Sequence, residues 1–149
     1  MYRAEARLIL HAVEQLVAAT SIVCGLGLAA GITQFPLAFL DGSPFGDYLM
    51  PGLIMAIVVG GSALLAAVAL GARRAVGVPL TALAGLILLS FEVVEVVTID
   101  RNTGDLLPLV VALQSSYTIF GLAMLGLAAY LWAPIHARKS LDIEHVRYG

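Results

Sequence analysis

Long runs of apolar residues recur along the chain, and four of them are long enough to cross a lipid bilayer. They cover residues 8–32, 49–71, 75–99 and 106–132. A helix needs about 20 residues to span a hydrocarbon core of about 30 Å. Lipid offers the backbone no hydrogen-bond partners, so each span must be helical. The pattern therefore predicts an all-α fold, a polytopic membrane four-helix bundle that forms one domain over residues 1–149.

The longest connection predicted between spans is the loop 33–48. Within it, Ser43 followed by Pro44 is typical of a helix start, with a hydroxyl cap and then proline at the first helical position. We expect the aromatic side chains of the loop to lie at headgroup level and to anchor the second span. The alternative is a lid over a cavity open to the outside. The aromatic residues are Phe35, Phe39, Phe45 and Tyr48.

Basic residues predict the orientation of the bundle. Seven of the eight Lys and Arg residues flank span ends that face one side, and only Arg101 falls on the other. By the positive-inside rule, both termini and the tail 133–149 are therefore expected to be cytoplasmic. The first span is too long for the apolar core of a signal peptide, and polar residues interrupt it, so we expect it to be retained.

Composition agrees with a membrane protein. Of the residues, 60% are hydrophobic and 12% are charged, with a mean hydropathy of +0.98, whereas soluble domains carry about 25% charged residues. A net charge of −2 argues against a nucleic-acid partner. A single lysine among the basic residues, with abundant Ala, Gly, Val and Leu, suggests a bacterial origin and hence the inner (plasma) membrane.

Two glutamates lie inside the third span. A charged side chain at bilayer depth costs on the order of 3 kcal/mol, and Glu92 and Glu95 are three residues apart, so they share one helix face. Counting residues from the span ends puts Gln114 level with Glu92 and Tyr117 one turn deeper. We therefore predict an intramembrane polar cluster of these four residues, with the Gln114 amide donating to Glu92. Glu92 is the candidate functional residue, in a pocket that opens outward; the alternative is a neutral acid that fixes helix register.

A second polar pair, His11 and Glu14, belongs to the other half of the bundle. We interpret it as a pair that reaches toward the inner headgroups. Because these residues and Glu92 lie at different depths, we do not expect them to form one metal site. His11 and His136 are both near the inner face, but we expect His136 to lie in water, so the sequence does not favour a haem between the helices. No nucleotide fingerprint appears. We expect no cofactor and no metal.

The segment SPFGDYLMPG at residues 43–52, which leads into Gly60 and Gly61, resembles a segment of small uncharacterised bacterial four-span membrane proteins. In those proteins an acidic residue in the third span is usual, and Glu95 is its counterpart here. The resemblance implies the class of protein and no particular chemistry.

Three functions are compatible with these features. Small residues on several spans favour a non-enzymatic bundle that acts as a homo-oligomer or as an accessory subunit of a larger membrane complex. The alternative is a proton-coupled transporter or carrier of small lipophilic molecules that uses Glu92. The third is an intramembrane lipid-modifying enzyme. The sequence favours it less, because no nucleophile–base pair appears in it.

Overall fold

The computed structural model describes residues 2–33, 35–99 and 107–148, with side chains described for 2–33, 35–97 and 108–133. These residues form helices and connecting segments, with no strand among them. The first transmembrane helix is α1 (Tyr2–Ala29). The second is continuous but composite, made of α2 (Leu49–Leu53), the π-helical η2 (Ile54–Gly60) and α3 (Gly61–Gly71). The third and fourth are α4 (Gly77–Ile99) and α5 (Leu107–Tyr148).

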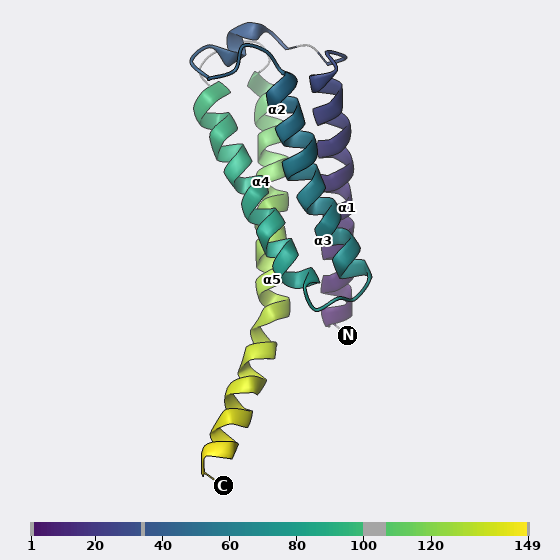
Figure 1. Ribbon diagram of the computed structural model, residues 1–149, viewed down its shortest axis with the longest axis vertical. Helices are drawn as coiled ribbons and strands as arrows, with labels where there is room; N and C mark the ends of the chain where they lie inside the picture. The colour runs from purple at the N-terminus through teal and green to yellow at the C-terminus, as the bar shows by residue number, and fades with distance from the viewer. Residues whose placement is uncertain (1, 34, 100–106, 149) are drawn as a thin grey trace.

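All four helices are long and apolar enough to cross a membrane, so the protein is a multi-pass membrane protein with the predicted helical-bundle fold. Figure 1 shows the helices side by side, with the connection after α1 at one end and the α3–α4 turn at the other. We call these the loop end and the turn end. The chain begins at the turn end, and α5 continues as a helix past it, through the predicted tail.

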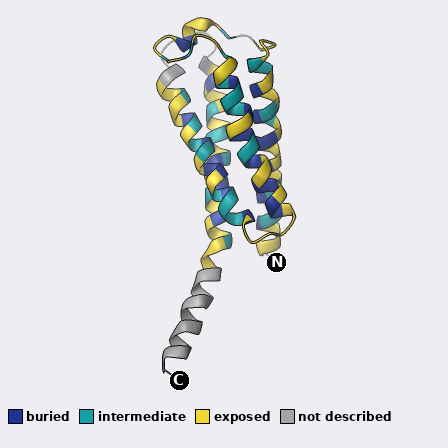
Figure 2. Ribbon diagram, in the orientation of Figure 1, coloured by how far each residue is buried: buried dark blue, intermediate teal, exposed yellow. Residues whose placement is uncertain are grey.

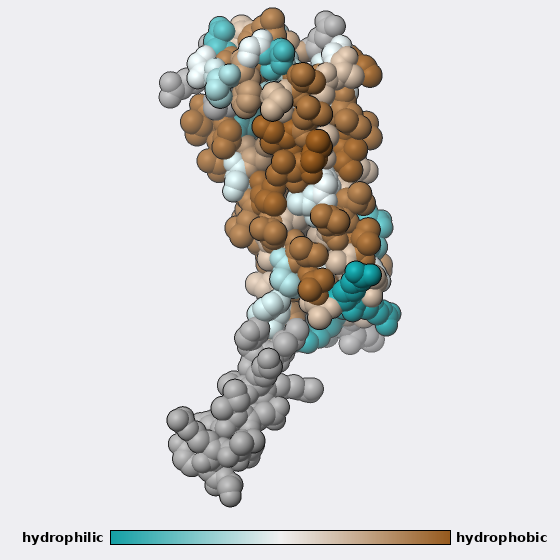
Figure 3. Space-filling view, viewed as in Figure 1, coloured by the Kyte–Doolittle hydropathy of each residue, from teal (hydrophilic) through white to brown (hydrophobic). Residues whose placement is uncertain are grey.

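Hydrophobic side chains cover the outside of the bundle as well as its core. Figure 2 shows exposed positions along the helices that face the viewer, and residues such as Ile57 and Val93 are more than 60% exposed. Figure 3 shows a broad hydrophobic band across the middle of the visible face, with hydrophilic residues toward both ends. This distribution suits a helix bundle surrounded by lipid.

Glycines allow the first two transmembrane helices to approach closely. A Cβ atom on Gly25 would lie 2.6 Å from the Gly52 carbonyl oxygen and from the Ala56 nitrogen, and one on Gly60 would lie 2.6 Å from Ile22. In a regular α-helix, position 60 would be rotated by about 80° around the helix axis relative to position 52, with position 56 halfway between them. The wider turn of the π-helix keeps all three facing α1.

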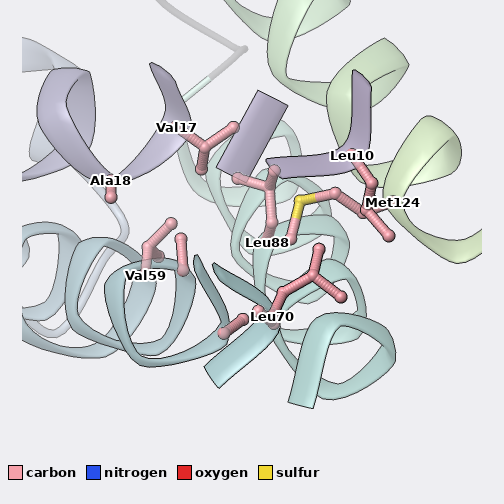
Figure 4. Packing of buried hydrophobic residues seen from close by; sticks show 10 residues of the cluster. Leu10, Val17, Ala18, Val59, Leu70, Leu88 and Met124 are labelled. Atoms are coloured by element: carbon pink, nitrogen blue, oxygen red, sulfur yellow. The ribbon is translucent and has the colours of Figure 1, made fainter. Parts of the chain in front are cut away.

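The core is a cluster of buried apolar side chains from all four transmembrane helices. Figure 4 shows Leu88 of α4 and Met124 of α5 beside Leu10 and Val17 of α1. All four side chains are at most 1% exposed. Four polar side chains are also buried in the bundle, Glu14 and Ser21 of α1 and Thr81 and Glu92 of α4.

The predicted helix start at Ser43 and Pro44 is wrong. The short 3-10 helix η1 (Leu37–Leu40) lies in the connection, and α2 begins at Leu49. The Asp47 carboxylate accepts a hydrogen bond from the Leu49 N–H at 3.0 Å, while the Ser43 hydroxyl accepts one from the Phe45 N–H at 3.2 Å. The N-cap of α2 is therefore Tyr48, and the side chains of Asp47 and Ser43 each fix a turn before the helix.

Candidate functional site

A cavity of about 520 Å³ occupies the loop-end half of the bundle. It lies between the α2–η2 segment on one side and α4 and α5 on the other, under the connection that contains η1. Its walls are mostly apolar and aromatic. Residues that line it include Phe39, Phe45, Tyr48, Met55, Val58, Leu86, Ser90, Phe91, Val94, Glu95, Val110 and Leu113.

Two features of the chain create this cavity. First, α4 packs closely along α3 at the turn end and makes less contact with η2, so the helices diverge toward the loop end, as Figure 1 shows. Second, the connection crosses above the divergence. The Phe35 ring lies 6.4 Å from the Phe39 ring and 6.2 Å from the Tyr48 ring, and the Tyr48 hydroxyl donates to the Pro36 carbonyl at 2.8 Å. The aromatic residues therefore roof a cavity, as in the lid interpretation.

Few polar groups reach the cavity. Glu95 is half-buried and lines it, as do Ser43 and Ser90. The Ser90 hydroxyl donates to the Leu86 carbonyl at 2.8 Å, so its oxygen still has acceptor capacity. Burial raises the pKa of Tyr48, whose phenol is thereby favoured as the neutral donor. An apolar cavity with a few polar groups at its edge is typical of a site that binds small molecules.

The prediction that Glu92 faces this pocket is wrong, because Glu95 lines the cavity and Glu92 does not. Successive residues of a helix are rotated by about 100°. This rotation directs Phe91, Val94 and Glu95 to the cavity and turns Glu92, which is 5% exposed, into the interior. Arg101, which is close enough in sequence to reach back toward Glu95, lies outside the described residues.

Glu92 and Gln114 do lie at one height. A Cβ atom on Gly85 would be 3.2 Å from the Gly121 carbonyl oxygen, so α4 and α5 cross there. Glu92 and Gln114 are each seven residues from that contact toward the loop end. The expected hydrogen bond between them is nevertheless not formed, because Oε2 of Glu92 and Nε2 of Gln114 are buried without a partner in the described part of the chain.

Tyr117 joins a different helix from the one predicted. Its hydroxyl donates to the Thr20 hydroxyl oxygen of α1 at 2.9 Å, and its ring packs edge-on against Phe120 at 6.5 Å. The predicted four-residue cluster is therefore divided, with Glu95 at the cavity, Glu92 and Gln114 in the interior, and Tyr117 bonded to α1. Sequence reasoning missed Thr20.

The interpretation of His11 and Glu14 as a headgroup pair is wrong for Glu14. Its side chain is completely buried, and Oε1 is hydrogen-bonded to the Thr81 hydroxyl of α4. His11 is half-buried, lies 3.0 Å from the Gln15 amide nitrogen through Nε2, and packs against Gly71. Sequence reasoning did not pair Glu14 with Thr81.

The two buried carboxyl groups occupy separate sites. Thr81, the partner of Glu14, is eleven residues from Glu92 along α4, a rise of about 16 Å. The apolar side chains of Val17, Leu88 and Met124 lie in the core between these levels. Among the described residues, no three or more His, Cys, Asp and Glu side chains gather as metal ligands.

Comparison with known proteins adds no family. No family model, curated protein or solved structure matches this chain. The resemblance of residues 43–52 to bacterial four-span proteins stays a prediction.

Proposed function

We propose that this protein is a membrane carrier that binds a small lipophilic molecule in the loop-end cavity. The observation that carries the proposal is the cavity itself, a volume of about 520 Å³ lined mostly by aliphatic and aromatic side chains. Sites for small molecules usually measure about 300–1,000 Å³ and combine apolar walls with a few polar groups.

The distribution of polar groups suggests how a ligand is oriented. Ser43, Tyr48 and Glu95 belong to the loop-end part of the lining, whereas Met55, Val58 and Leu86 lie deeper. The apolar part of a ligand would cover these deeper side chains and keep water from them. Removal of apolar surface from water contributes about 25 cal/mol per Å² to the free energy of binding. A polar end would then meet the serine, phenol and carboxyl groups. The proposal therefore favours an amphipathic ligand with its polar end toward the loop.

The edges of the cavity suggest entry from the bilayer. Val58 is 46% exposed, Leu86 is 53% exposed and Val94 is 56% exposed, and all three line the cavity while facing the outside of the bundle. In a membrane, those edges lie against lipid. A lipophilic molecule dissolved in the bilayer could enter laterally between the α2–η2 segment and α4.

The charge distribution supports an orientation with the turn end in the cytoplasm. Arg3, Arg7, Arg73 and Arg74 belong to the turn end, and acidic residues of the connection belong to the loop end. In the bacterial plasma membrane that the composition suggests, the cavity would then occupy the outer leaflet half of the bundle.

The packing of the small residues favours the carrier over the accessory or oligomeric subunit that they suggested from sequence. Gly60 packs on Ile22, Gly71 packs on His11, and Ala66 and Ala67 are at most 2% exposed. These residues are used within one chain and are not left for a second copy. The lipid-modifying enzyme receives less support, because His11 belongs to the opposite end from the cavity serines.

Binding of Nile red, a neutral lipophilic fluorophore, tests the proposal. Protein in lipid nanodiscs should give a saturable signal above that of empty nanodiscs. Val94→Trp fills the cavity and should abolish the saturable part. Val93→Trp is the matched control, because the neighbouring valine is 63% exposed and does not line the cavity, so it should bind as the wild type does. A signal equal to that of empty nanodiscs, or equal loss in both variants, would reject the carrier.

A further inference from the structure

Two polar side chains, Glu14 and Thr81, meet inside the bundle near the turn end, and His11 is three residues from Glu14 on α1. Glu14 and Thr81 are both 0% exposed, and His11 is half-buried one helical turn from Glu14. Two atoms of this group are buried without a hydrogen-bond partner in the described part of the chain, Oε2 of Glu14 and Nδ1 of His11. Unpartnered buried polar atoms of this kind commonly bind water or a ligand.

The Thr81 hydroxyl can serve both protonation states of Glu14. It has one hydrogen and lies within reach of two acceptors, Oε1 of Glu14 and the Gly77 carbonyl at 3.0 Å. If Glu14 is ionised, the hydroxyl donates to Oε1. If Glu14 carries a proton on Oε1, that proton is donated to the Thr81 oxygen, and the Thr81 hydrogen turns to Gly77. Rotation of one hydroxyl therefore accommodates the gain or loss of a proton without movement of heavier atoms.

The His11 ring is positioned by Gly71 and Gln15. A Cβ atom on Gly71 would lie 3.0 Å from Cε1 of the imidazole, so glycine at the end of α3 makes room for the ring. The Gln15 amide nitrogen can only donate, so Nε2 of His11 accepts from it and the hydrogen of the neutral ring is on Nδ1. Nδ1, which carries this hydrogen, is the buried atom of His11 that has no hydrogen-bond partner in the described part of the chain.

Few other charges act on this group. On α1, Arg7 lies one turn beyond His11, and its guanidinium donates to the Leu70 carbonyl at 3.0 Å. The turn contributes Arg73 and Arg74. The segments that pack here, 61–71 of α3 and 77–91 of α4, contain no titratable residue, and residues 118–133 of α5 contain only Tyr130. Glu14 is therefore the single acid at this level of the described bundle.

We propose that Glu14, Thr81 and His11 form a proton-binding site inside the membrane, in which Glu14 exchanges one proton with the aqueous phase at the turn end through His11. Exposed Gln15 turns away and Nε2 of His11 takes up a proton from water. The ring then releases the Nδ1 proton to a bridging water, which passes one of its own to Glu14. The ring ends neutral, and the ionised carboxylate becomes a neutral acid. This site goes beyond the proposed carrier and does not depend on the cavity.

Infrared spectroscopy of protein labelled with ¹³C-carboxyl glutamate tests the proton on Glu14. The wild type should show a labelled carbonyl band of protonated acid that decreases in Glu14→Gln. Glu5→Gln is the matched control on the same helix, where Glu5 is exposed, and should leave the band intact. If Glu14→Gln does not fold, Glu14→Asp serves, because aspartate carries no label. An unchanged labelled band in a folded Glu14 variant would overturn the proposal.

Exchange of the acid proton for deuterium tests the role of His11. The band of Glu14 should shift on transfer to deuterated buffer, and His11→Ala should slow this shift by about a hundredfold, the lower end of what a positioned proton-transfer group contributes. Free imidazole in the buffer should restore the rate. Thr81→Val should change the band frequency, while Thr81→Ser should not. An exchange rate that is unchanged in His11→Ala would exclude the route through His11. Because Nile red binding is measured separately, failure here leaves the carrier proposal standing.

Discussion

Glu92 and Glu95 are one helical turn apart, yet their side chains meet different surroundings. Glu95 borders a cavity, and Glu92 lies in the interior of the bundle with one oxygen that has no partner in the described part of the chain. Residue counting predicted Glu92 level with Gln114, and each lies seven residues from the contact of Gly85 with Gly121. It could not predict which of two faces, only about 60° apart, would meet a cavity. That outcome depends on how α4 diverges from α2, which is a property of the whole bundle.

Burial of Tyr48 gives a prediction for its titration. Its pKa is raised because burial disfavours the phenolate, so it should ionise above the ordinary tyrosine value of about 10. The folded state tolerates only the neutral phenol well. Its stability is therefore unaffected by Tyr48 below a pH of about 10 and falls as the pH rises from that value through the higher pKa of the folded state. The tyrosinate absorbance of Tyr48 is obtained by subtracting the absorbance of Tyr48→Phe from that of the wild type. It should appear above a pH of about 10. Its appearance below pH 10 would show that the phenol is not buried.

The turn between α3 and α4 contains a residue in an unfavourable backbone conformation. Arg73 has a φ of 53°, in the left-handed region, which costs a non-glycine residue roughly 1–2 kcal/mol. Arg73→Gly should therefore raise the free energy of unfolding by about 1 kcal/mol, measured by circular dichroism during denaturation in SDS.

Arg74→Gly is the matched control for charge, since it removes the same positive charge from the same turn. Arg74 is not among the described residues with positive φ. It should show no gain in stability. Equal gains in both variants would attribute the effect to charge and not to the backbone.

At the scale of elements, the sequence predicted each span but not its internal geometry. Residues 49–71 were expected to form one regular helix, and the structure divides them into α2, η2 and α3. The π-helical turn is determined by the partner helix, because it keeps positions 52, 56 and 60 against α1. Apolar periodicity along a membrane span is weak, since lipid-facing and buried positions are both hydrophobic.

Close packing of α1 on α2 predicts a large effect of one methyl group. Gly25→Ala should destabilise the fold by about 1–3 kcal/mol, because the new Cβ atom would overlap the backbone of residues 52 and 56. Gly61→Ala is the control, because its Cβ atom would meet nothing within 4 Å. It should be neutral or stabilising by up to about 1 kcal/mol. Unfolding in SDS measures both, and similar effects would contradict the close approach.

At the scale of the molecule, the charge distribution predicts the orientation. In a Cys24→Ala background, Arg74→Cys should react with a membrane-impermeant maleimide only after the cells are opened, and Asp47→Cys should react in intact cells. The physical reason is the retention of basic segments in the cytoplasm. The reverse pattern of labelling would place the cavity in the inner leaflet.

The class of protein followed from the sequence because four long apolar spans admit few folds. The cavity did not follow from it. Its walls come from segments far apart in the chain, such as Phe45, Met55, Leu86 and Val110, and none of these residues differs in type from a packing residue. Only the aromatic content of the 33–48 connection indicated a lid.

Native mass spectrometry of protein released from its own membrane tests the central claim most directly. The wild type and Val93→Trp should each retain one lipophilic small molecule per chain, which is lost on activation. Val94→Trp protein released from the membrane should carry no such molecule, because the indole fills the cavity. Identical occupancy in Val94→Trp and Val93→Trp, or no bound molecule in the wild type, would contradict the assignment of the loop-end cavity as the carrier's binding site.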